Sequence, residues 1–150
     1  MLTIQHSTEF VSALKNEKDT LQVFTDILKK EEDVLTQGKI DDLDFLASDK
    51  ARLVEKLKAL GEQRSEYLLS QDLSSDSIGM DKWLTNHDHN SQVTALWNEI
   101  LQLAQVAKQL NHTNGLIISS HLEHNQRAFS ALQSAAGNIS LYGPNGQPFV

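Results

Sequence analysis

The sequence contains no cysteine. Disulfide bonds, thiolate nucleophiles and zinc sites built on thiolates are therefore excluded. Both prolines, Pro144 and Pro148, fall near the end of the chain, so no obligate helix breaker interrupts the first 143 positions. Aromatic residues make up only 6% of the chain, and β-branched residues nowhere alternate with polar ones over the length of a strand. These absences predict an all-α protein.

Positive charge and long apolar runs are also scarce. The formal net charge of −7 opposes non-specific binding to nucleic acid and to anionic membrane surfaces. No apolar run approaches the roughly 20 residues that a membrane span needs, and the amino-terminal residues lack the basic and apolar regions of a secretory signal peptide. We expect a cytoplasmic protein with no nucleic-acid partner and no membrane insertion.

Two segments in the first half of the chain carry apolar residues at heptad spacing. The first is expected to form a helix over residues 8–35, capped by Ser7 or Thr8. The second is expected to form a helix over residues 42–69. Gly38 lies between them and suits the left-handed conformation that ends many helices. So short a connection predicts an antiparallel helical hairpin.

Charged residues interrupt both apolar seams at regular places. The apolar positions are Phe10, Leu14, Leu21, Phe24, Leu28 and Leu35 in the first helix and Leu43, Leu46, Leu53, Leu57, Leu60 and Tyr67 in the second. Glu17 and Glu31 fill two heptad slots of the first seam, and Lys50 and Arg64 fill two slots of the second. The aliphatic stems of the two basic residues are expected to lie along the seam with their charged ends in water.

The second half of the chain predicts a loop, a long helix and a tail. Residues 70–90 are expected to form a flexible polar loop, apart from a short turn of helix around Trp83 that packs back on the bundle. Residues 91–136 predict a single third helix because no proline enforces a break; the alternative is two helices joined near Asn114–Gly115. Together, residues 1–136 form the predicted helical domain, and residues 137–150 form a flexible tail.

The third helix is longer than the hairpin expected to cover it. Hairpin helices of about 28 residues reach about 42 Å, whereas about 46 residues reach about 69 Å. Large apolar residues continue through its second half, as Leu116, Ile117, Ile118, Leu122, Phe129 and Leu132. Part of this stripe is therefore expected to bind a partner helix or a second copy of the chain. The alternative is that the whole stripe forms bundle core.

Histidine is the residue type from which metal binding or catalysis could come. His121 and His124 would share one helix face, and His87 and His89 fall in the polar loop. No glutamate is followed three residues later by histidine, as a di-iron bundle requires, and the paired-histidine motif of zinc proteases is absent. We expect no enzyme, no metal and no cofactor; a histidine metalloprotein is the distant alternative.

Three short motifs resemble the FlgN family of flagellar type III export chaperones. They are Asn111–Ile117, Glu123–Gln126 and Leu141–Gly146, and their order and spacing match together. Asp42–Leu43 and the heptad residues of the second helix are also compatible with that family, so the likeness covers about residues 24–147.

The resemblance implies a function. The implied fold is an antiparallel helical hairpin followed by a long third helix. They bind the carboxy-terminal helical segment of hook-associated (hook–filament junction) proteins, prevent premature assembly of this cargo and deliver it to the cytoplasmic domain of the export gate protein. A generic helical adaptor, or a coiled-coil regulator that self-associates without cargo, is the alternative.

The resemblance also assigns roles by position. The implied cargo-binding residues are Leu116, Ile117, Leu122, Asn125, Phe129 and Leu132. The implied hinge residues are Asn111, Asn114 and Gly115, and the implied export-gate contacts are Leu141, Tyr142 and Gly143.

Overall fold

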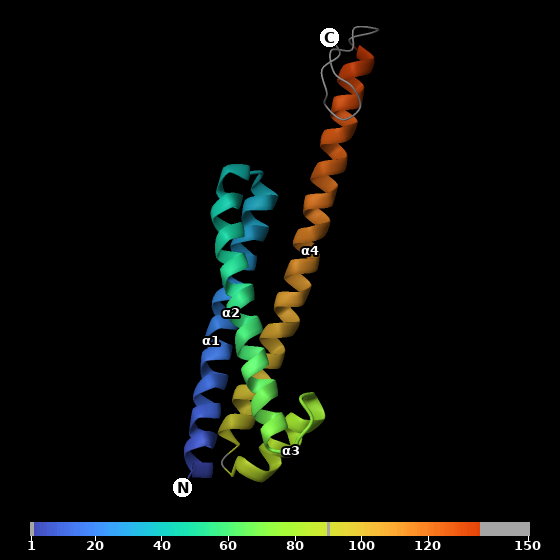
Figure 1. Ribbon diagram of the computed structural model, residues 1–150. Coiled ribbons are helices and arrows are strands. Elements are labelled where there is room, and N and C mark those ends of the chain that lie inside the picture. Colours follow the sequence, from blue (N-terminus) through green and yellow to red (C-terminus); the bar gives the residue numbers. More distant parts are fainter. Residues whose placement is uncertain (1, 90, 136–150) are drawn as a thin grey trace. The chain divides into compact units, whose positions relative to one another are not determined.

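The computed structural model describes the backbone of residues 2–89 and 91–135 and the side chains of residues 6–39, 41–89 and 91–134. Its elements are α1 (Leu2–Gln37), the 3-10 turn η1 (Ile40–Asp42), α2 (Leu43–Ser70), α3 (Ser77–His87) and α4 (Gln92–Ala135) (Figure 1). No strand occurs in these ranges, which confirms the predicted all-α class. None of the helices within them is both long and apolar enough to cross a membrane.

The chain divides into two compact units, Met1–Asn114 and Gly115–Val150. The first unit contains α1, η1, α2, α3 and the part of α4 that ends at Asn114. The second contains the remainder of α4. As predicted, one continuous helix crosses Asn114–Gly115. The boundary between the two units nevertheless falls at the joint that the sequence suggested.

Helices α1 and α2 form the predicted antiparallel hairpin (Figure 1). Two ion pairs set its register. The guanidinium of Arg64 donates to both carboxylate oxygens of Glu17, at 3.1 and 3.2 Å. The ammonium of Lys50 lies 3.3 Å from an oxygen of Glu31. Each pair is separated from the other by two heptads along both helices, because the same seam spacing runs forward in α1 and backward in α2.

The expectation that Lys50 and Arg64 hold their charges in water is wrong. The side chains of Arg64 and Glu17 are only 21% and 9% exposed, and Glu31 is as buried as Glu17. Each base fills the slot directly opposite an acid, so the charges neutralise each other inside the seam. A shift of one heptad would place both glutamates against other residues, and the ion pairs therefore oppose misregistration.

The first part of α4 runs parallel to α1. Lys18 lies 3.9 Å from Glu99, and farther along both helices the side-chain amide of Asn114 donates to the backbone oxygen of Leu28 at 3.0 Å. The buried core of this unit takes residues from all four helices. They are Phe10, Leu14, Leu21 and Leu28 of α1, Leu68 of α2, Met80, Trp83 and Leu84 of α3, and Trp97, Ile100 and Ala107 of α4.

Residues 70–90 are more ordered than predicted, because α3 occupies half of them. The carboxylate of Asp76 caps α3 by accepting from the backbone nitrogen of Gly79 at 3.1 Å. A hydrogen bond from Ser74 is the main reason that the pKa of Asp76 lies below its ordinary value. The buried face of α3 is anchored by Trp83, which is 1% exposed and whose ring nitrogen donates to the Tyr67 hydroxyl at 3.3 Å. Burial of an indole outweighs the polar character of the surrounding sequence.

Both ends of α1 bear on the sequence predictions. The helix begins at Leu2 rather than at Thr8, so a cap at Ser7 or Thr8 is wrong. Serine and threonine cost less than about 1 kcal/mol each inside a helix, and no glycine or proline precedes them to stop it. At the other end the prediction is confirmed, because Gly38 has a φ of +71°, in the left-handed region.

Candidate functional site

The two parts of α4 differ sharply in burial. Up to Asn114, its apolar seam is covered, and Trp97, Ile100 and Ala107 are at most 6% exposed. Beyond that point, large apolar side chains are exposed: Leu116 58%, Ile118 49%, Leu122 57%, Phe129 41% and Leu132 69%. Exposed apolar residues gathered along one helix are typical of a surface that binds a partner.

Helix geometry decides which of these residues form one surface. At about 100° per residue, Ile118, Leu122, Asn125, Phe129 and Leu132 fall within an arc of about 80°. Their spacing of four, three, four and three residues is a heptad pattern. We call these five residues the C-terminal stripe.

The sequence prediction of the cargo-binding face overlaps this stripe only in part. The helix brings together four of the predicted residues, Leu122, Asn125, Phe129 and Leu132. It places Leu116 on the opposite side, about 160° from the middle of the arc, and half-buried Ile117 about 100° away. The stripe instead includes Ile118, which belongs to the heptad pattern and which the prediction left out.

The predicted hinge residues lie in different environments. Asn111 is exposed, whereas Asn114 is 1% exposed and its amide nitrogen donates to Glu31 at 2.8 Å as well as to the Leu28 backbone. The carbonyl oxygen of the same Asn114 side chain is buried and has no hydrogen-bond partner among the described residues. An unsatisfied buried acceptor costs about 1–3 kcal/mol. Asn114 is thus a specific but imperfect anchor where the buried part of α4 ends.

Gly115 follows this anchor in an open position, and substitution by alanine should stiffen α4. A Cβ built at Gly115 meets no atom within 4 Å. Because glycine inside a helix costs about 1 kcal/mol relative to alanine, Gly115→Ala should slow amide hydrogen exchange in the adjoining turns of α4. Gly38→Ala is the matched control, since its φ of +71° strains any side chain and predicts destabilisation. Unchanged or faster exchange in Gly115→Ala would contradict a soft joint.

The predicted export-gate contacts Leu141, Tyr142 and Gly143 lie outside the described residues, as does the predicted tail of residues 137–150. Their roles remain predictions.

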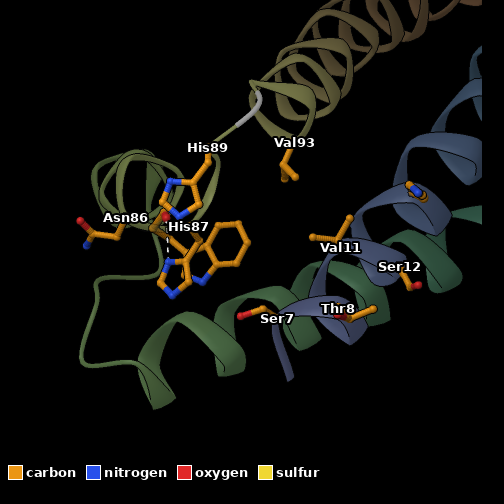
Figure 2. Close-up of a pocket in the computed structure, with 10 residues that line it drawn as sticks. Ser7, Thr8, Val11, Ser12, Asn86, His87, His89 and Val93 are labelled. Carbon is orange, nitrogen blue, oxygen red and sulfur yellow. Dashed lines mark hydrogen bonds between the residues drawn. The ribbon is translucent and has the colours of Figure 1, made fainter. Parts of the chain in front are cut away.

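A pocket in the first unit, lined by both polar and apolar side chains, gathers two of the histidines (Figure 2). The ring of His87 stacks on Trp83 at 4.7 Å between centroids, and its Nδ1 lies 2.9 Å from the Trp83 backbone oxygen. His89, Val11 and Val93 also line this pocket. In the described part of the chain, no group of three or more His, Asp or Glu residues is placed to hold a metal ion. The stacking gives His87 a structural role, and the pocket contains none of the predicted site residues.

Comparison with known proteins places the chain in one family. The family model described as FlgN protein matches residues 1–148. The flagella synthesis protein FlgN of Yersinia enterocolitica is 28% identical over 137 residues, covering 89% of this chain and 84% of the relative. The protein of the same name from Proteus mirabilis is 25% identical over 134 residues, covering 85% of this chain and 81% of the relative. No solved structure matches. The chain therefore belongs to the FlgN family.

Proposed function

We propose that this chain is a cytoplasmic export chaperone for hook-associated proteins, and that its C-terminal stripe binds the carboxy-terminal helical segment of this cargo. The observation that carries the proposal is the exposure of Ile118, Leu122, Phe129 and Leu132 on one side of a helix. Its relatives are named flagella synthesis proteins, which agrees with a role in flagellar assembly.

Burial of the stripe supplies the binding energy. At about 25 cal/mol per Å² of apolar surface, covering four large side chains contributes several kcal/mol, from which the entropy of association is subtracted. In such a complex the apolar face of the cargo segment would be covered, and it could not associate with other copies of the cargo. Release needs only dissociation, so the proposal involves no reaction and no nucleotide.

Co-expression tests the cargo part of the proposal. The full chain and a carboxy-terminal segment of a hook-associated protein should co-purify, and their combined mass should correspond to one copy of each. A generic self-associating adaptor would instead remain a homo-oligomer whose mass does not change when the segment is added. Sizing the chain alone and with the segment therefore separates the two functions.

Deletion of residues 138–150 tests delivery independently of binding. We expect the truncated chain to bind the cargo segment with unchanged affinity, because the stripe lies within α4. We also expect it to fail in export of the hook-associated protein, because Leu141, Tyr142 and Gly143 are removed. Normal export by the truncated chain would show that the tail does not contact the gate.

A further inference from the structure

Charge is unevenly distributed over the helices. Acidic and basic residues recur through α1 and α2, and four of them occupy the buried seam between these helices. Helix α4 has 44 residues, and its Asp, Glu, Lys and Arg residues are only Glu99, Lys108, Glu123 and Arg127. A chain with a net charge of −7 thus contains one long helix that is almost free of charge.

The two charged residues that share the second unit's helix with the stripe lie on its back. Glu123 and Arg127 are about 140° and 180° from the middle of the stripe. They pair with each other, with a nitrogen-to-oxygen distance of 3.8 Å. Both charges are therefore turned away from anything that covers the stripe.

The flanks of the stripe carry no formal charge. These positions are Ser119, Gln126 and Gln133 on one side and His121 and Ala128 on the other. In helix pairs the flanking positions are where charged residues select a partner. Asn125, inside the stripe, is also uncharged. The whole partner-facing side of this helix is thus apolar or neutral and polar.

We infer that the stripe selects a helix whose own flanks are uncharged, an inference that rests on the proposed function and identifies the chemistry of the cargo segment. Lysine or glutamate beside the apolar face of a partner would lose water on binding and meet no opposite charge. Serine, glutamine, asparagine or alanine carry no such penalty. Selection therefore works through rejection of charged flanks, and binding of the correct helix depends little on salt.

Continuity along α4 supports a helix as the occupant. The seam that α1 and α2 cover up to Asn114 has the same heptad spacing as the stripe. The seam of a second copy's hairpin is a poor substitute, because Glu17, Glu31, Lys50 and Arg64 are committed to each other within it. A foreign helix with an apolar face and neutral flanks fits the exposed segment better.

Two synthetic peptides of about three heptads each test this inference with the full chain. Both have the same Leu and Ile face and the same net charge. One has Gln and Ser flanks, and the other has Glu flanks balanced by Lys on its outer face. We expect the neutral-flank peptide to bind at least about tenfold more tightly, with a Kd that changes less than about twofold between roughly 0.05 and 0.5 M NaCl.

Variants of the chain locate the effect at the flanks. Gln126→Lys combined with Ala128→Lys should reduce the preference for the neutral peptide at least about tenfold, because the lysines can pair with the glutamate flanks. Ser120→Lys combined with Ser134→Lys adds the same charge on the back of the helix and should leave the preference unchanged.

In the peptide titrations, the inference would be overturned if the Glu-flanked peptide bound equally or more tightly, if binding of the neutral-flank peptide depended steeply on salt, or if neither peptide bound. It would also be overturned if the control lysines changed the preference as much as the flank lysines do. A dimer of the chain that the neutral-flank peptide does not displace would contradict it as well. The proposed function is decided separately by the complex with the hook-associated segment. A stable complex that depends strongly on salt would refute neutral selection and leave the chaperone role intact.

Discussion

Replacement of Phe129 or Leu122 by aspartate is expected to abolish binding of the hook-associated segment while leaving the helix content of the protein unchanged. Both side chains are exposed and lie outside the buried core, so neither substitution removes a core contact. In a complex, each would bury a carboxylate against an apolar face, and an unpaired buried charge costs several kcal/mol. A loss of at least about a hundredfold in affinity follows. Titration calorimetry and far-UV circular dichroism measure the two quantities.

Leu116→Asp is the matched control for this experiment. Leu116 is as exposed as Leu122 and lies on the same helix, but it points about 160° away from the middle of the stripe. The variant should bind the segment like the unchanged protein. If Leu116→Asp abolishes binding and the two stripe variants do not, the cargo-binding face lies on the other side of α4.

The second large effect concerns stability, and Arg64→Leu is expected to lower the free energy of unfolding by about 3–5 kcal/mol. The substitution leaves the Glu17 carboxylate buried without its two hydrogen bonds and removes the guanidinium that lies 4.9 Å from the centre of the Trp97 ring. Adding Glu17→Leu should recover most of the loss, because two leucines then face each other in an apolar seam. Urea denaturation of the single and double variants measures both effects.

Arg52→Leu provides a control for the removal of an arginine. Its side chain is 71% exposed and lies 3.7 Å from an exposed Asp49. Exposed ion pairs of this kind contribute about 0–1 kcal/mol, so the variant should unfold at nearly the same urea concentration as the unchanged protein. Failure of Glu17→Leu to rescue Arg64→Leu would mean that the arginine acts through Trp97 rather than through the ion pair.

Heptad spacing predicts the hairpin well because the period of the apolar residues is a local property of the sequence. It gives the pairing of α1 with α2, and the glycine between the two seams separately predicts the turn at Gly38. Spacing also locates the slots of Glu17 and Arg64, but opposition of the two charges appears only when one seam is read backward against the other. The equal separation of the two acids in α1 and of the two bases in α2 would have allowed both ion pairs to be predicted from the sequence.

Helix α3 was harder to predict, because its stability comes from tertiary contacts. The segment is rich in serine and aspartate, which favour turns in isolation. Burial of Met80, Trp83 and Leu84 against three other helices overrides that local preference. The start of α1 illustrates the opposite case, since a good cap at Thr8 was available and the helix continued through it.

The exposed apolar surface of α4 followed from helix lengths alone, but its composition did not. Assigning the cargo-binding residues from the family resemblance included Leu116, whereas choosing them by angular position around the helix selects Ile118. The resemblance to a family identified a region of α4 and not a face. Only the rotation of each residue about the helix axis separates the stripe from the back of the helix.

The spacing of the seam residues along α1 is repeated in reverse along α2. At high protein concentration, every side-chain contact that α1 makes with α2 could therefore be made equally well with α2 of another molecule, including both ion pairs. Such domain swapping is opposed by the turn at Gly38, whose φ of +71° reverses the chain and holds the two arms of one molecule at a high effective concentration. A substitution that straightened this turn into a continuous helix would keep the two arms of one chain apart and would convert monomers into interlocked dimers.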